Sequence, residues 1–155
     1  ETSLKFINRG HDIPCFERAV KNLRKRNIEV VVHIINGLPY ETEEMMIQTA
    51  KYLNTLDIQG VKIHMLYVLK NTELNLIYQT QPFELLSLSS YVDIVVKQLR
   101  HLNKNIIIHR ITGDPPKDDL VAPSWTLKKF IVSNEIDKIM RKNNYYQGDI
   151  CNEVK

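Results

Sequence analysis

The sequence has few cysteines and no long apolar run, and each of these shortages excludes a class of protein. Its 155 residues include two cysteines, Cys15 and Cys151, which lie far apart and lack the short spacing of metal-binding pairs. Two widely separated cysteines are typical of reduced, intracellular proteins, so we expect a cytoplasmic location. No apolar stretch approaches the roughly 18 residues of a membrane-spanning helix and no signal peptide is visible, so we expect no membrane partner.

A large excess of charge of one sign is also missing. The net charge of +3 is too small to indicate nucleic-acid binding by itself. With 43% hydrophobic and 25% charged residues, the composition is that of a folded globular chain, and we expect one domain over residues 1–155. The first residue is Glu1, inside helix-like sequence, and we expect the chain to be a fragment of a longer protein.

Three short runs rich in β-branched residues stand out, and they predict parallel strands covered on at least one face. Helical patterns separate them, at the spacing of β-α-β units. The runs are Ile28–Ile35, Val61–Leu69 and Asn105–Ile111. Helices are predicted after the capping residues Asp12, Thr42 and Ser87 or Ser89, and a fourth from near Pro123 to about Asn143. Either an open doubly wound sheet or part of a (β/α) barrel fits this order.

Polar residues gather where the three predicted strands end. Ligands of parallel α/β folds bind at the carboxyl ends of strands. Each run also carries a histidine, at positions 33, 64 and 109, where a purely structural strand would prefer valine or isoleucine. Three such histidines on successive strands indicate a functional site rather than histidines with hydrogen-bond partners in the core, because polar groups in apolar runs need such partners or a functional role.

Two other functions remain open from the residues alone. The three histidines could bind zinc, although no H-x-H or H-x3-H pair is present and side chains alternate between the faces of a strand. The basic tract Lys21–Arg26 is typical of a solvated helix face, but it could bind RNA or protein as part of a non-catalytic α/β module. A glycine-rich phosphate loop and the common hydrolase motifs are absent.

Five segments, taken in order, resemble the radical S-adenosylmethionine proteins of the YhcC/YtqA-like group. The resemblance covers essentially the whole chain and matches the carboxyl half of those proteins. The segments are Ile7–Asp12 (INRGHD), His33–Thr42 (HIINGLPYET), Lys62–Leu69 (KIHMLYVL), His109–Pro116 (HRITGDPP) and Ala122–Lys129 (APSWTLKK). Relatives usually have glycine at the position of Tyr40, so the corner after the first strand is expected to differ slightly.

The resemblance implies an α/β fold that is half of a partial (β/α)6 barrel, with about three parallel strands and flanking helices. It also implies that the intact protein uses S-adenosylmethionine and a [4Fe-4S] cluster to start radical chemistry on an unknown substrate. The cluster cysteines belong to the amino-terminal half, which is therefore the expected partner. Alone, this chain is expected to retain neither cofactor and to be inactive, because Cys15 and Cys151 lack the cluster spacing.

The same resemblance implies roles for individual residues. Arg9 matches an arginine that pairs with the cofactor carboxylate, and His33 matches a position that reaches the ribose. Backbone near Leu66 and Tyr67 is expected to border the adenine. The cofactor-binding candidates are Arg9, His33, Asn36, Gly37, Leu66 and Tyr67, and the substrate-side candidates, assigned by position alone, are His64, His109, Arg110 and Asp114.

A three-stranded half-barrel would leave its inner sheet face bare. Leaving several hundred Å² of apolar surface in water would cost on the order of 10 kcal/mol, comparable to the stability of a small domain. We therefore expect either a homodimer or a terminal segment, 144–155, that folds across the opening.

Overall fold

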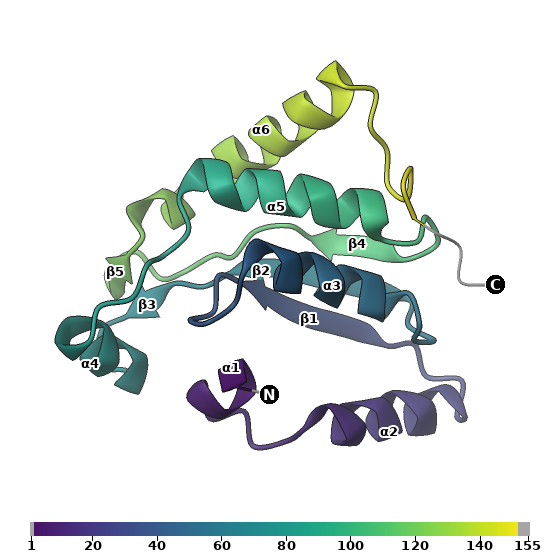
Figure 1. The fold of residues 1–155 in the computed structure, drawn as a ribbon, viewed down its shortest axis with the longest axis horizontal. Coiled ribbons are helices and arrows are strands. Elements are labelled where there is room, and N and C mark those ends of the chain that lie inside the picture. Colours follow the sequence, from purple (N-terminus) through teal and green to yellow (C-terminus); the bar gives the residue numbers. More distant parts are fainter. Residues whose placement is uncertain (1, 152–155) are drawn as a thin grey trace.

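The computed structural model describes residues 2–151 and is centred on a three-stranded parallel sheet. The strands are β1 (Val31–Asn36), β2 (Gly60–Met65) and β4 (Ile107–Arg110), in the order β1-β2-β4. Figure 1 shows the three strands side by side, with the connections between them running through helices. The predicted α/β fold with three parallel strands and flanking helices is confirmed.

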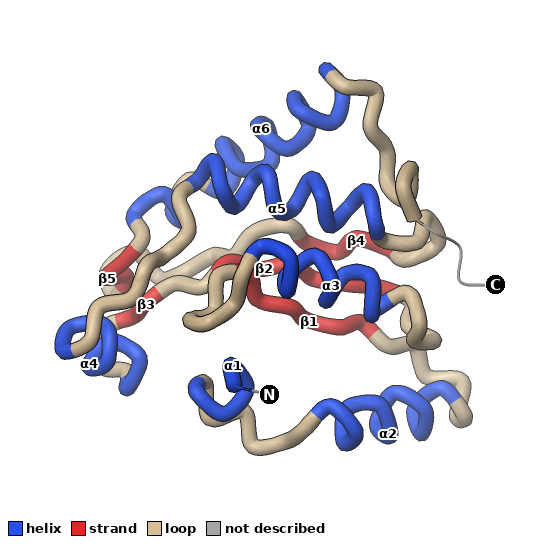
Figure 2. The backbone as a smooth tube through the Cα atoms, viewed as in Figure 1, coloured by secondary structure: helices blue, strands red, loops and turns tan. Residues whose placement is uncertain are grey.

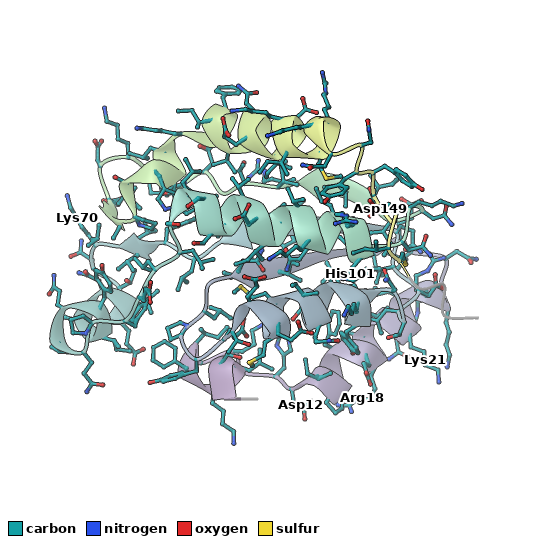
Figure 3. All side chains as sticks on the ribbon, turned by 45° about the horizontal axis from the view of Figure 1, so that its top comes forward. Asp12, Arg18, Lys21, Lys70, His101 and Asp149 are labelled. Atoms are coloured by element: carbon teal, nitrogen blue, oxygen red, sulfur yellow. The ribbon has the colours of Figure 1, made fainter. Side chains whose placement is uncertain are left out.

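Four helices form one layer on one face of this sheet. They are α2 (Ile13–Arg24), α3 (Glu43–Leu53), α5 (Leu88–His101) and α6 (Lys129–Lys142). Figure 3, turned toward this face, shows α6, α5 and α3 as successive rows in front of the strands, with α2 below them. The phenol of Tyr52 on α3 donates to Glu17 on α2 at 2.7 Å, which joins two of these helices. Among the described residues, no helix is long and apolar enough to cross a membrane.

Helix starts follow the capping residues expected from the sequence. Asp12, Thr42 and Ser87 each accept a hydrogen bond from the backbone N–H three residues further on, at 2.8, 3.3 and 3.1 Å. The fourth predicted helix is broken into a 3-10 turn, η1 (Ser124–Leu127), and α6.

The second predicted strand is shorter than expected. The chain leaves the sheet after β2, and β3 (Val68–Leu69) pairs antiparallel with β5 (Leu120–Ala122) in a separate ribbon. The single strand predicted over Val61–Leu69 is therefore wrong in its last part. Two short helices, α1 (Thr2–Phe6) and α4 (Glu73–Thr80), complete the described elements. Figure 2 shows β3, β5 and α4 beyond the carboxyl ends of the sheet strands, joined by long loops.

The two faces of the sheet differ in cover. Alternating residues of β1 and β2 point into the core beneath the helices, and each is at most 9% exposed: Val32, Ile34, Val61, Ile63 and Met65. The residues between them lie on the opposite face, which we call the open face. There Ile35 is 41% exposed and Ile107 on β4 is 62% exposed.

The carboxyl-terminal segment does not cross the open face within the described residues. The backbone N–H of Gly148 donates to the carbonyl of Leu99 at 3.1 Å, and the Gln147 side chain donates to the carbonyl of Ile106 at 2.7 Å. The segment thus lies against the end of α5 and the start of β4. The expected covering role of 144–155 is wrong as far as Cys151, and residues 152–155 lie outside the described part of the chain.

Candidate functional site

A row of three basic residues crosses the open face. His33 on β1 is paired in register with Lys62 on β2, and Lys62 is paired with Arg110 on β4. Neighbouring strands lie about 4.8 Å apart, so three potentially cationic side chains leave the sheet side by side. His33 and Arg110 are exposed and Lys62 is half-buried. We call these three residues the basic row.

His64 lies beside the row, one step nearer the carboxyl end of β2. Its ring centroid is 5.4 Å from that of His33. Its Nε2 atom is buried and has no hydrogen-bond partner among residues 2–151. Burial lowers the pKa of His64 below its ordinary value, and the charges of His33, Arg110 and Lys62 lower that pKa further.

The pKa of His33 is lowered as well. The largest cause is partial burial, followed by the positive charges of Lys62, Arg110 and Arg9. Both imidazoles are consequently held toward the neutral state, in which one ring nitrogen can accept a proton and the other can donate a hydrogen bond.

Arg9 approaches the row from the loop between α1 and α2. Gly10, in a left-handed conformation with φ of +75°, turns the chain directly after it. Arg9 lines a surface hollow of about 470 Å³ and its charge acts on His33. Arg9 and His33, two of the predicted cofactor-binding residues, therefore come near each other.

No carboxylate forms an ion pair with the basic row in the part of the chain that the structure describes. The side chains of Arg9, Lys62 and Arg110 make no ion pair or hydrogen bond there. Asp114, a substrate-side candidate, instead accepts a hydrogen bond from Lys129 Nζ at 2.9 Å. That bond, more than the charge of Arg110, lowers the pKa of Asp114. An anion is thus the ligand that the open face suits best.

His109, the third strand histidine, lies apart from the other two. Its imidazole sits over Gly60 at the start of β2, with Nε2 2.6 Å from where a Cβ on that glycine would be. Within the described residues, no group of three or more histidine, cysteine, aspartate or glutamate side chains could hold a metal ion. The three histidines therefore do not form the set that the zinc hypothesis needs.

The side chain of Asn36 faces the helices rather than the open face. It is 2% exposed and exchanges two hydrogen bonds with Gln98 on α5, at 2.7 and 2.8 Å. The same Gln98 amide also donates to the carbonyl of Met46 at 2.9 Å. Any contact of Asn36 with a cofactor on the open face would have to come from its backbone.

The corner after β1 has two residues in the left-handed region. Gly37 has φ of +87°, and a Cβ there would lie 2.9 Å from Leu86 Cδ1. Tyr40 has φ of +69° although it carries a side chain, so it keeps the backbone that glycine would adopt. Tyr40 is 70% exposed, and its ring lies edge-on to that of Phe6 with 5.6 Å between the ring centroids. Both residues line a cleft of about 650 Å³.

Leu66 and Tyr67 follow the last residue of β2. The N–H of Leu66 donates to the carbonyl of Asn36 at 2.9 Å, which extends the β1–β2 pairing by one bond. The Tyr67 ring packs so close to Gly113 that a Cβ there would lie 3.0 Å from Cε1. Both residues are half-buried at the carboxyl end of the sheet, where the sequence predicts a ligand.

Sequence reasoning missed Lys62, the centre of the basic row. The signal was present, because Lys62 and His64 alternate with the apolar Val61, Ile63 and Met65. The basic tract Lys21–Arg26, at the carboxyl end of α2, is a different surface: both of its arginines are engaged within the domain, Arg24 with Asp57 at 3.0 Å and Arg26 with the carbonyl of Asn22 at 3.1 Å.

Comparison with known proteins gives consistent matches. Residues 58–142 match the family described as the Radical_SAM C-terminal domain. The chain is 43% identical to YtqA of Bacillus subtilis over 148 residues and 27% identical to YhcC of Escherichia coli over 143 residues. These matches cover 96% and 92% of the chain, and the chain spans 46% of the length of each relative.

Solved structures with a similar fold include that of Elp3 from the archaeon Methanocaldococcus infernus with an amino-terminal deletion, with a TM-score of 0.82. The match covers 94% of this chain and 34% of the Elp3 chain, at 21% sequence identity. At this identity the likeness concerns the fold alone.

Proposed function

Because this chain belongs to the Radical_SAM C-terminal domain family, we propose that it is the carboxyl-terminal part of a radical S-adenosylmethionine enzyme. When intact, that enzyme would cleave S-adenosylmethionine reductively at a [4Fe-4S] cluster and so start radical chemistry on its substrate. The observation that carries the proposal is the open, basic sheet face in a chain that matches this family. The resemblance to the YhcC/YtqA-like group, expected from the sequence, is confirmed by the two relatives.

The residues of the open face suit the organic part of the cofactor. Arg9 would pair with the carboxylate of S-adenosylmethionine, since its planar guanidinium offers two parallel donors. His33, within the field of Arg9, would hydrogen-bond the ribose through its neutral imidazole. The backbone at Gly37, Leu66 and Tyr67 would border the adenosyl group at the carboxyl ends of β1 and β2.

The cysteines of this chain do not fit the cluster. Cys15 is exposed in the first turn of α2, and Cys151 lies beside Asn54 at the opposite end of the helical layer. A [4Fe-4S] cluster needs several thiolates converging on one point. We therefore propose that cluster ligands come from another segment of a longer protein, and that the same segment covers the open face.

In a preparation of the 155-residue chain alone, we propose that the open face pairs with a second copy. Ile35 and Ile107 would provide the apolar part of such a contact, and the free edges of β1 and β4 could add backbone hydrogen bonds. Sedimentation equilibrium over a range of concentrations would detect this association.

The experiment for the proposed function compares the longer protein with the chain alone. After anaerobic reconstitution with iron and sulfide and addition of a reductant, the longer protein should convert S-adenosylmethionine to methionine and 5′-deoxyadenosine. The 155-residue chain should retain no stoichiometric iron and form no 5′-deoxyadenosine. Absence of 5′-deoxyadenosine from an iron-loaded longer protein would overturn the proposal.

Within that protein, Arg9→Ala should weaken S-adenosylmethionine binding by about 10- to 100-fold. The reason is the loss of a charge-assisted pair, which contributes roughly 1.5–3 kcal/mol. Arg18→Ala is the matched control, because Arg18 is an exposed arginine on α2 (Figure 3). Titration by calorimetry measures both variants, and equal affinity of the two would remove Arg9 from the cofactor site.

A further inference from the structure

The basic row is unfavourable for the isolated sheet. Like charges directly opposite each other on neighbouring strands are destabilising, and here the cationic Lys62 is paired with the cationic Arg110. The side chains of Lys62 and Arg110 make no ion pair or hydrogen bond among the described residues. Asp114 is bound by Lys129 instead, and that bond, more than the charge of Arg110, lowers the pKa of Asp114. A second, independent observation is the buried Nε2 atom of His64, which has no hydrogen-bond partner among the described residues either.

We propose that Lys62, Arg110 and His64 anchor a phosphate group of the substrate, a proposal that rests on the proposed function above. It deepens that function by naming the chemistry through which the substrate is held. The cofactor carboxylate and the substrate phosphate would then occupy different parts of one open face.

Charge and geometry favour phosphate over carboxylate. Lys62 and Arg110 provide two permanent positive charges, which match a phosphate dianion, whereas a carboxylate carries one negative charge and two oxygens. The guanidinium of Arg110 can bind two phosphate oxygens at once, and the ammonium of Lys62 can bind a third. His64 Nε2 is covered by protein atoms in this structure, so the ring would turn to bring this unpaired atom to the phosphate and donate to it in the tautomer that carries the proton on Nε2.

The anchor is distinct from the place assigned to the cofactor carboxylate. Arg9 comes from the α1–α2 loop and its charge acts on His33, on β1. Lys62 and Arg110 lie on β2 and β4, on the other side of His33 in the strand order. A substrate held there by its phosphate would lie next to the predicted ribose position, where the radical forms in the proposed reaction.

Phosphate binding can be measured on the 155-residue chain without any cofactor, at a concentration low enough that sedimentation shows it to be monomeric and its open face uncovered. Inorganic phosphate is titrated at low ionic strength while the imidazole signals are followed by nuclear magnetic resonance. The His33 and His64 signals should shift and saturate. The His101 signal is the internal control, because His101 lies at the end of α5, on the covered side of the sheet.

Matched variants distinguish a specific phosphate site from a general effect of the positive charge of the chain. Lys62→Gln and Arg110→Gln should each weaken phosphate binding by about tenfold or more, and Lys62→Arg should retain it. Lys142→Gln and Arg141→Gln, which remove the same charges from exposed positions on α6, should have no effect. Equal weakening by the two pairs of variants, or an equal shift of His101, would overturn the anchor.

Other anions identify the source of the phosphate. If methyl phosphate binds more tightly than dimethyl phosphate, the substrate group is a terminal phosphate. If the two bind equally, the substrate group is a phosphodiester. Acetate binding as tightly as phosphate would overturn the proposal. Phosphate binding without 5′-deoxyadenosine from the longer protein would overturn the proposed function alone, whereas 5′-deoxyadenosine without phosphate binding would overturn the anchor alone.

Discussion

The two faces of the β1-β2-β4 sheet are made by alternate residues of the same strands, yet they differ in nearly every physical property. On the covered face, Val61 and Ile63 are 0% exposed and pack against α3 and α5. On the open face, Lys62 and His64 alternate with them in sequence; Lys62 is positively charged, and His64 has a buried nitrogen without a hydrogen-bond partner among the described residues. Stability is concentrated on the first face, and ligand chemistry on the second.

This division follows from the period of a strand. Successive side chains point to opposite faces, so the same strand can contribute apolar side chains to the core and polar side chains to the open face. The apolar set is a core that excludes water, and the polar set costs stability unless a ligand or another segment completes it. Substitutions on the two faces should therefore have effects of different size and different kind.

The largest expected difference comes from removing the same side chain on each face. Ile63→Ala should lower the free energy of unfolding by about 2–5 kcal/mol, because it leaves a cavity under α5. Ile35→Ala, at a position that is 41% exposed, should cost about 1 kcal/mol or less. Urea unfolding followed by circular dichroism measures both variants. Similar losses would show that the open face is part of a packed core.

A polar pair on the covered face provides the second test. Asn36→Ala should cost about 1–3 kcal/mol, because it leaves the buried Oε1 atom of Gln98 without the donor that Asn36 provides. Asn105→Ala is the control, as Asn105 is exposed and its side chain makes none of the hydrogen bonds described.

The double variant Asn36→Leu with Gln98→Leu should cost less than the sum of the two single leucine variants, since no unpaired amide then remains. Additive losses would mean that the two amides do not act as a pair. Activity of the longer protein should follow stability in these variants, because the Asn36 side chain points away from the open face.

Much of this fold could be predicted from the sequence, because the signals were local. Asp12, Thr42 and Ser87 cap helices by hydrogen bonds that span three residues, and the apolar runs mark the strands. The ribbon of β3 and β5 could not be predicted in this way. It joins Val68 to Ala122, a pairing of distant segments too short to show a period.

The candidate site was predicted in position but not in composition. Asn36 follows Val32 and Ile34 at the period of a strand, so its orientation toward the helices was available from alternation. Its position directly before the Gly37 corner instead suggested a contact with the cofactor. The separation of His109 from His33 and His64 depends on the register shift between Val61 and Lys62 opposite β4, which no local pattern reveals.

The smallest expected effect is a dependence of stability on pH that originates from the open face. Burial, with the charges of His33, Arg110 and Lys62, lowers the pKa of His64 in the folded state. The unfolded chain, with an ordinary histidine pKa of about 6.5, then binds more protons than the folded chain. The free energy of unfolding should therefore be highest above about pH 6.5 and decrease as the pH falls below that value.

His64→Gln should reduce this decrease, because glutamine does not titrate, and the difference between variant and parent isolates the contribution of His64 from those of the other histidines. Urea unfolding at about pH 7.5 and about pH 5.5 measures it. Added phosphate should reduce the decrease in the parent chain, since an anion beside Lys62 and Arg110 favours protonated His64. An equal decrease of the unfolding free energy in parent and variant would mean that His64 is solvated like an ordinary surface histidine. The buried Nε2 atom of His64 would then no longer support an incomplete ligand site on the open face.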